Sequence, residues 1–202
     1  MLQFNALLLG PYQVEILFAL CTLLGGRRKI DSQDMLKDNG IISILENMFE
    51  RLPWDSFSSS SEPESPNEQE AGIRGPGCEC TLESALCVQY LRLLHNFCDR
   101  DCDNYYNRRL LLSDVERKFI FGDHITPEYD TTKLPSGLLL KIVATFINES
   151  DESPYRFWLA SCVESFLRGS SSAEQVFVAK SGLMEYLIVD TTSKRLHCSG
   201  SL

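Results

Sequence analysis

Hydrophobic residues near the start of the chain recur at steps of three and four positions, the spacing of one face of an α-helix. Between Tyr12 and Leu24 these residues are Val14, Leu17, Phe18, Cys21 and Leu24. Gly25-Gly26 follows, and glycine commonly ends a helix. The pattern therefore predicts an amphipathic helix over residues 12–24.

Two shorter helices are expected after this glycine pair. Asp31-Ser32 predicts the N-terminal cap of the first, which ends at Asn39-Gly40. The second begins at Ile41, and Pro53 closes it because proline cannot continue a helix. Three helices are thus predicted before residue 55.

The middle of the chain is less regular. Residues 81–97 have clear helical spacing, and Thr81 with Ser84 can serve the N-terminal end of that helix. Residues 105–112 are expected to resume a helix with Arg108 and Arg109 on its solvent face, and Ser113 is a candidate cap for another. Residues 119–134 mix aromatic residues with glycine and proline, which predicts a loop with short elements.

The C-terminal part repeats the order of the N-terminal part. After an apolar segment at 138–146 and a turn at 148–154, a helix is expected over residues 157–167, ending at Gly169. A short helix at 173–179, a break at Ser181-Gly182 and a further helix at 183–188 follow. Residues 16–45 show the same succession of long helix, glycine, short helix, glycine and helix.

This recurrence predicts an all-α fold built from armadillo/HEAT-like helical repeats. In such repeats a glycine permits a sharp turn into a helix whose apolar face stacks on the neighbouring repeat. A generic helical bundle would show the same periodicity, but it would not require glycines at matching places.

Residues 55–77 differ from their surroundings, being acidic and rich in serine and proline with few apolar groups. Such a segment cannot offset the entropy of ordering, so a disordered loop is expected. The predicted organisation is a helical segment at 1–54, the loop at 55–77 and a helical segment at 78–202, together one continuous solenoid truncated at both ends. The loop is either an inert spacer or a site of phosphorylation, with Ser65-Pro66 as a candidate.

Charge and cysteine usage narrow the function classes. A net charge of −9 argues against nucleic acid as a partner. The apolar run from Ile16 to Leu24 is much shorter than the ~20 residues that a membrane span needs, so no membrane insertion is expected. Eight cysteines without a secretory signal indicate reduced thiols in a cytosolic or nuclear compartment, and a cytoplasmic location is expected.

One cluster of residues offers soft ligands of the kind that zinc prefers. The zinc candidates are Cys78, Cys80, His95, Cys98 and Cys102. Their spacing is not that of a standard zinc finger, and reduced thiols in loops and in the core are the alternative. Cys98 near His95 is also the only candidate pair for a cryptic cysteine hydrolase, although no nucleophile elbow is present.

Two other motifs have simpler interpretations. Residues 99–104 superficially resemble a calcium loop, but Asn104 and Leu110 stand where the required glycine and glutamate should be, so a polar interhelical turn is expected. Arg27-Arg28-Lys29 does not complete a phosphate-binding loop. It is either a solvated surface or a patch that recognises an acidic peptide.

Several strings resemble the family of the TRP channel-associated scaffold, also called the tumour-necrosis-factor-receptor ubiquitous scaffolding and signalling protein. They are LLGGRRKID (23–31), MFERL (48–52), the segment 78–104, which ends in HNFCDRDCDN, and residues 156–187. The resemblance implies an intracellular, non-catalytic adaptor without a cofactor that recruits substrates to a cullin-4 RING ubiquitin ligase. It also implies the ligase adaptor subunit, the TNF receptor and a TRP channel as protein partners, at membrane-associated receptor complexes.

Overall fold

The computed structural model describes residues 6–54, 81–99, 107–122, 136–151 and 153–189. Every regular element in these ranges is helical, which confirms the all-α class. The acidic segment predicted at residues 55–77 lies outside the described residues.

The N-terminal helices lie where the hydrophobic spacing predicts them. They are α1 (Ala6–Leu24), α2 (Lys29–Asp38) and α3 (Ile41–Phe49). The predicted cap of α2 was wrong, because its N-cap is Arg28, and Asp31 instead lies in the first turn, where a carboxylate complements the helix dipole. Between α2 and α3, Gly40 has a φ of 72°, a conformation that costs other residues energy.

The middle helices correct two predictions. Helix α5 (Leu82–Cys98) has the expected cap, since the Thr81 side chain accepts a hydrogen bond from the Ser84 amide. The short 3₁₀ helix η1 (Asn107–Leu111) follows, but Arg108 is buried and does not face solvent as predicted. Helix α6 (Asp114–Phe121) includes residues 119–121, which had been assigned to a loop, and residues 123–135 lie outside the described part.

The C-terminal helices follow the predicted succession. They are α7 (Leu138–Asn148), α8 (Arg156–Arg168), α9 (Ser172–Val178) and η2 (Ala179–Leu183), with residues 184–189 also helical. The backbone leaves helical geometry at Ser181 and at Gly182, whose φ is 91°. Gly40 and Gly182 thus occupy matching places, each after a short helix and before the next one.

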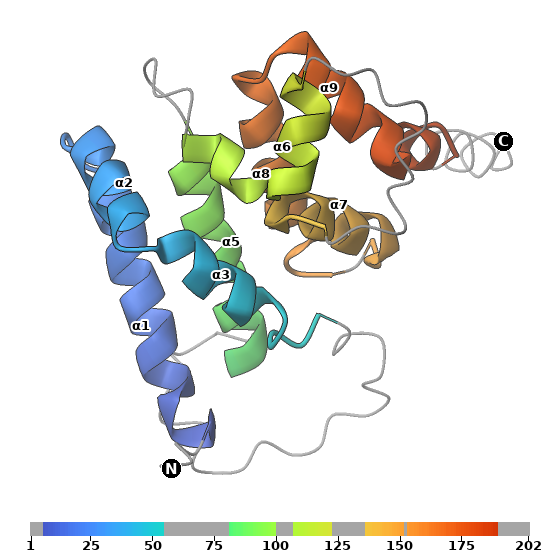
Figure 1. The fold of residues 1–202 in the computed structure, drawn as a ribbon. Coiled ribbons are helices and arrows are strands. Elements are labelled where there is room, and N and C mark those ends of the chain that lie inside the picture. The colour runs from blue at the N-terminus through green and yellow to red at the C-terminus, as the bar shows by residue number, and fades with distance from the viewer. Residues whose placement is uncertain (1–5, 55–80, 100–106, 123–135, 152, 190–202) are drawn as a thin grey trace, which may run out of the picture.

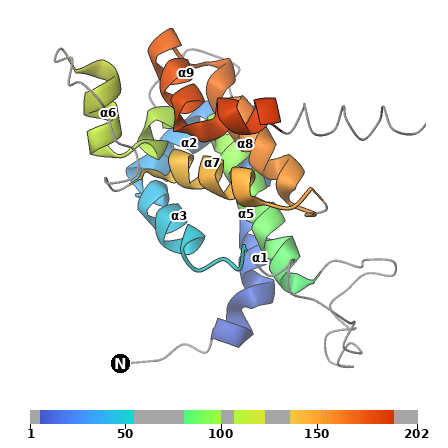
Figure 2. The ribbon, with the colours of Figure 1, turned by 90° about the vertical axis from the view of Figure 1, so that its right-hand side faces the viewer.

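The three longest helices, α1, α5 and α8, pack side by side in chain order (Figures 1 and 2). On one side of α5, the Cys21 thiol contacts the Gln89 carbonyl, and on the other the Cys162 thiol donates to the Leu91 carbonyl at 3.1 Å. All three helices run in the same direction, because Lys29, just after α1, and Arg168, at the end of α8, both reach Asp99 at the end of α5.

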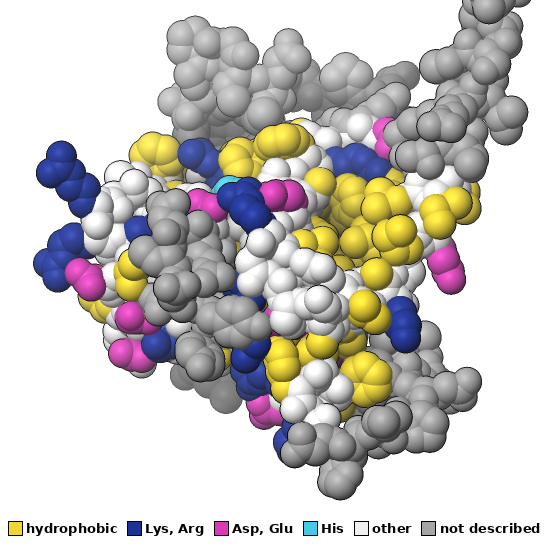
Figure 3. All heavy atoms as spheres, turned by 90° about the horizontal axis from the view of Figure 1, so that it is seen from above, with side chains coloured by type: hydrophobic (Ala, Val, Ile, Leu, Met, Phe, Trp, Pro, Cys, Tyr) yellow, Lys and Arg dark blue, Asp and Glu magenta, His cyan; other side chains and the backbone are white. Residues whose placement is uncertain are grey.

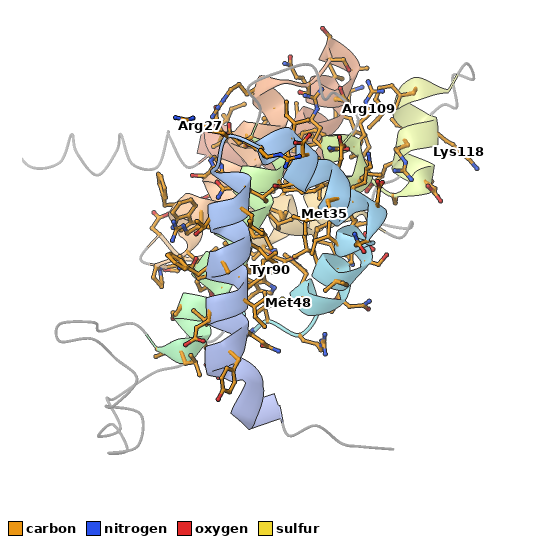
Figure 4. All side chains as sticks on the ribbon, turned by 90° about the vertical axis from the view of Figure 1, so that its left-hand side faces the viewer. Arg27, Met35, Met48, Tyr90, Arg109 and Lys118 are labelled. Carbon is orange, nitrogen blue, oxygen red and sulfur yellow. The ribbon has the colours of Figure 1, made fainter. Side chains whose placement is uncertain are left out.

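The core is centred on α5. Its buried side chains are Cys87, Tyr90, Leu91, Leu93, Leu94, Phe97 and Cys98. Each large apolar side chain removed from water contributes about 1.5–3 kcal/mol before the entropic cost is subtracted. The Tyr90 hydroxyl donates to the Leu45 carbonyl at 2.8 Å, and its ring contacts Trp54 at a centroid distance of 6.1 Å, so α5 also fixes α3 (Figure 4).

Gly137, the N-cap residue of α7, lies in a tight space against the start of α6. The Gly137 amide donates to the buried Glu116 carboxylate at 3.0 Å. A Cβ at this position would lie 2.7 Å from the Leu111 carbonyl oxygen and would also collide with the Ser113 amide nitrogen. Both obstacles are backbone atoms, so the chain itself would have to move.

Gly137→Ala is therefore expected to lower the free energy of unfolding by about 2–3 kcal/mol, as overpacking against backbone does. Gly25→Ala is the control, because a Cβ there would meet ordinary contacts at 3.6 Å, and a change within about 1 kcal/mol is expected. Urea denaturation followed by circular dichroism measures both variants. Equal midpoints for the two variants would contradict the crowding at Gly137.

Candidate functional site

One face of the α1–α5–α8 layer carries exposed aromatic side chains around an arginine. Phe18 of α1 is 54% exposed and Phe157 of α8 is 70% exposed. Arg92 lies on α5, the helix between α1 and α8, and the partly buried Trp158 lies beside both Arg92 and Phe157. We name these four residues the Arg92 surface.

Arg92 is held by its neighbours on both sides. Its guanidinium lies over the Trp158 ring at 5.5 Å from the centroid, and Nη1 donates to Gln89 Oε1 at 3.3 Å. On the α1 side, burial raises the pKa of the Cys21 thiol, and the positive charge of Arg92 lowers it in part. The arginine thus lies within electrostatic range of α1 while it is stacked on α8.

His95 supports the Trp158 ring one turn further along α5. The two rings meet edge to face at a centroid distance of 6.1 Å. His95 Nδ1 lies 3.2 Å from the Ser161 carbonyl oxygen, and the Ser165 hydroxyl donates to the His95 carbonyl. These contacts hold the His95 imidazole against α8, where it supports the Trp158 ring of the Arg92 surface.

A polar junction closes the carboxyl end of α5. Asp99 accepts Lys29 Nζ at 2.8 Å and Arg168 Nη1 at 3.1 Å, which joins α2, α5 and α8. The buried Gln33 side chain donates to the Phe97 carbonyl at 2.9 Å, where the last turn of α5 has no amide partner of its own. The predicted polar turn at 99–104 is seen only at Asp99, since residues 100–106 lie outside the described part.

A second buried charge lies at the start of α9. The Glu174 carboxylate accepts the Ser171 amide at 2.7 Å, pairs with Arg109 Nε at 3.2 Å and has Arg108 Nη2 at 3.6 Å. Burial alone would raise the pKa of Glu174. The Ser171 hydrogen bonds and the two arginine charges outweigh burial, and together they lower that pKa.

The sequence carried a signal for this glutamate that the hydrophobic periodicity does not reveal. Residues 113–116 and 171–174 both read Ser-x-x-Glu, and in both the serine hydroxyl and the glutamate carboxylate form a complete capping box. Both glutamates are fully buried, and each also holds a second element: Glu116 bonds Gly137, and Glu174 pairs with η1. Only the capping role of Ser113 was predicted.

The structure separates the predicted zinc ligands into two groups. Cys78, Cys80 and Cys102 lie outside the described residues, so the full set cannot be assembled from this structure. His95 is directed at the Ser161 carbonyl, and the Cys98 side chain is buried. Within the described ranges, no group of three or more potential metal ligands comes together.

Cys98 also has the wrong electrostatics for a nucleophile. Burial raises the pKa of the Cys98 thiol to about 12, and Arg108 offsets this only in part. A reactive cysteine needs a lowered pKa. The structure therefore gives no support to the Cys98–His95 hydrolase hypothesis. Cys21, Cys87 and Cys162 are also buried free thiols.

The basic cluster at residues 27–29 is not a single patch. Arg27 projects from the turn after α1 (Figure 4), and Arg28 pairs with Asp31 in an exposed ion pair. Lys29 instead turns inward to Asp99, with only 14% of its side chain exposed. Two of the three charges are thus engaged within the chain.

Apolar side chains are also exposed at the two sides of the helical stack. On α1, Tyr12, Ile16 and Leu23 follow one outward stripe. Figure 3 shows a second group of hydrophobic side chains over α9 and the helical residues after it, where Val176, Met184 and Ile188 are exposed. Among the helices that the structure describes, none is long and apolar enough to cross a membrane.

These features define an all-helical protein in which long parallel helices are stacked in order and one face of the stack is aromatic and basic. The chain belongs to the family described as protein of unknown function (DUF3689), whose model matches residues 32–201. It is 33% identical over 199 residues to the short transient receptor potential channel 4-associated proteins of Homo sapiens and Mus musculus. The match covers 91% of this chain and 24% of each relative, so the chain spans about a quarter of their length. No solved structure matches the chain.

The buried thiols give a chemical test of the electrostatics. Because burial raises the pKa of the Cys98 thiol to about 12 and keeps the side chain from solvent, iodoacetamide should label Cys98 only after unfolding. Cys87, whose pKa burial also raises to about 12, should behave alike. Peptide mapping by mass spectrometry, with and without concentrated guanidinium, measures the labelling. Rapid modification of Cys98 in the native chain would revive the nucleophile hypothesis.

Glu174→Gln should destabilise the chain by about 3 kcal/mol at neutral pH, because it leaves buried arginine charge without its carboxylate. The pKa of Glu174 is lowered on folding, so its stabilisation is complete above the unfolded pKa of about 4.3 and is lost as pH falls through the folded pKa. Urea midpoints of the parent and the variant should therefore converge in acid. Glu164→Gln, at an exposed i,i+4 pair, is the control and should cost no more than about 0.5 kcal/mol. A pH-independent difference would contradict the assignment.

Proposed function

We propose that this chain is a non-catalytic protein-interaction scaffold made of armadillo-type helical repeats. In its specific form it is a substrate-recognition adaptor of a cullin-4 RING ubiquitin ligase, as the family resemblance implies. We place it in the cytoplasm at receptor complexes, acting in TNF-receptor and calcium-channel signalling.

The observation that carries the scaffold proposal is the ordered stack of α1, α5 and α8. Each of these parallel helices is followed by a short element, namely α2, η1 or α9. Left-handed glycines at positions 40 and 182 mark the same step in the first and last of these units. Stacked units of this kind present equivalent helices along one continuous face, a form suited to binding other proteins.

Two further findings support the proposal. The matched relatives are named as proteins associated with a TRP channel, which describes a binding role. On this chain, exposed rings gather on the face formed by the three stacked helices, and aromatic residues and arginine are the types enriched where proteins bind one another.

The test is affinity purification of the tagged 202-residue chain from cells, with mass spectrometry scoring the cullin-4 ligase components against an unrelated helical-repeat protein. Recovery of those components above the control is the expected result. Phe157→Ala should reduce the protein partners recovered, because truncating an exposed aromatic anchor costs binding energy. Ile44→Ala is the matched variant, since Ile44 is similarly exposed but lies on α3.

The outcomes separate the two levels of the proposal. If the folded chain recovers specific partners but no ligase component, the scaffold stands and the cullin-4 role of this segment is wrong. If it recovers no partner above the control, the scaffold proposal itself is contradicted.

A further inference from the structure

Arg92 is a half-buried basic residue. It has no carboxylate within ion-pair distance among the described residues, a property that it shares with Arg27, Arg51, Lys118 and Lys180. Most of the basic side chains in that part of the chain have one: Arg28, Lys29, Lys37, Arg108, Arg109, Arg117, Lys141, Arg156 and Arg168. Arg92 is half-buried, so its charge is also incompletely hydrated. Its partners among the described residues are the neutral Gln89 amide and the Trp158 ring.

We propose that the Arg92 surface binds a short extended peptide in which an aspartate or glutamate stands next to an aromatic or large aliphatic residue. The carboxylate pairs with Arg92, and the apolar residue packs against Phe157 and Trp158. This inference rests on the proposed scaffold function and specifies the chemistry of its partner.

The geometry of Arg92 favours a carboxylate. A guanidinium that lies over an indole face keeps its N–H donors in its own plane. Nη1 of Arg92 donates to Gln89, and the remaining donors are of the kind that binds carboxylates in a bidentate manner. The Trp158 ring also holds the guanidinium in place, which lowers the entropy lost when a partner binds. An anion that approaches here gains a partly desolvated charge pair, stronger than one at a fully hydrated surface.

The surrounding charges favour a single carboxylate over a more highly charged anion. Asp99 and Glu164 lie near the carboxyl ends of α5 and α8, and both share Arg168 as their counterion. With Lys29, which also pairs with Asp99, this group has two negative and two positive charges and is neutral overall. The chain's net charge of −9 disfavours a phosphate dianion more than a carboxylate.

The exposed rings set the rest of the specificity. Phe18 and Phe157 are exposed on α1 and α8, the two helices that pack on either side of α5. Packed helices are spaced about 8–10 Å apart, so the three helices span about 20 Å, the length of about six extended residues. An extended peptide that crosses the layer therefore contacts both rings while its acidic residue lies over α5.

The chain contains two tryptophans, Trp54 and Trp158, which makes nuclear magnetic resonance a direct readout. Trp54 Nε1 donates to the Phe49 carbonyl in the core, away from the Arg92 surface. The probes are synthetic, capped nine-residue peptides in a Gly-Ser background with a central Glu-Phe pair, and matched Gln-Phe, Glu-Ala and phosphoserine-Phe peptides. The indole cross-peak of Trp158 should move on titration of the Glu-Phe peptide up to about 1 mM, while that of Trp54 stays in place.

Arg92→Gln should weaken binding of the Glu-Phe peptide about tenfold and bring it level with the Gln-Phe peptide. Arg51→Gln is the control, because Arg51 is exposed and bonds only to the Asn47 carbonyl, and it should leave the affinity unchanged. Added salt should weaken binding of the Glu-Phe peptide to the parent chain but not to the Arg92→Gln variant. Urea midpoints equal to the parent's show that both variants are folded.

Three results would overturn the inference: equal affinity for the Glu-Phe and Gln-Phe peptides, tighter binding of the phosphoserine peptide than of the Glu-Phe peptide, or an unmoved Trp158 signal at the highest peptide concentration. Each leaves the scaffold proposal standing if cellular partners are still recovered. Conversely, if the peptide binds in a way that depends on Arg92 while no ligase component is recovered from cells, that result supports peptide binding by the Arg92 surface and rejects only the cullin-4 role.

Discussion

The burial of α5 between α1 and α8 is the constraint on which the rest of the structure depends. A helix with apolar residues on two sides must find a partner on each, and α1 and α8 are these partners for α5. Because both partners run parallel to α5, the three carboxyl ends arrive at the same place. The junction of Lys29, Asp99 and Arg168 is a consequence of that alignment, since the ends of parallel helices concentrate unpaired carbonyls and attract cations.

Buried polar groups make the order of elements specific. Glu116 and Glu174 accept hydrogen bonds from the N-cap amides of α6 and α9. Each carboxylate also binds a second segment: Glu116 accepts the Gly137 amide, and Glu174 pairs with an arginine of η1. A buried carboxylate contributes little net stability by itself, but it is costly to leave unpaired. If η1 or Gly137 were displaced, Glu174 or Glu116 would be buried without its second partner. These carboxylates therefore destabilise alternative packings more than they stabilise the native one.

Local signals were sufficient for most of the helices. Hydrophobic spacing located α1, α3, α5 and α8, and the glycines at 40 and 182 were recognised because a positive φ leaves few other residues. Periodicity failed at Arg108, since a long basic side chain at a helix surface looks the same whether it faces water or a buried glutamate 66 residues later. The Arg92 surface was missed for the same reason: its arginine and its tryptophan are separated by 66 residues and meet only because α5 and α8 are neighbours.

The distribution of charge explains how a stack of ordinary helices acquires one distinctive face. Most of the described lysine and arginine side chains pair with a carboxylate, and at Asp99 and Glu174 packing brings the partners together from different helices. Where packing instead brings an indole to a guanidinium, the charge is ordered but not neutralised. An ordered guanidinium loses less entropy when a partner binds, and its unneutralised charge attracts an acidic partner. An acidic partner is therefore expected at Arg92, which has no carboxylate within ion-pair distance among the described residues.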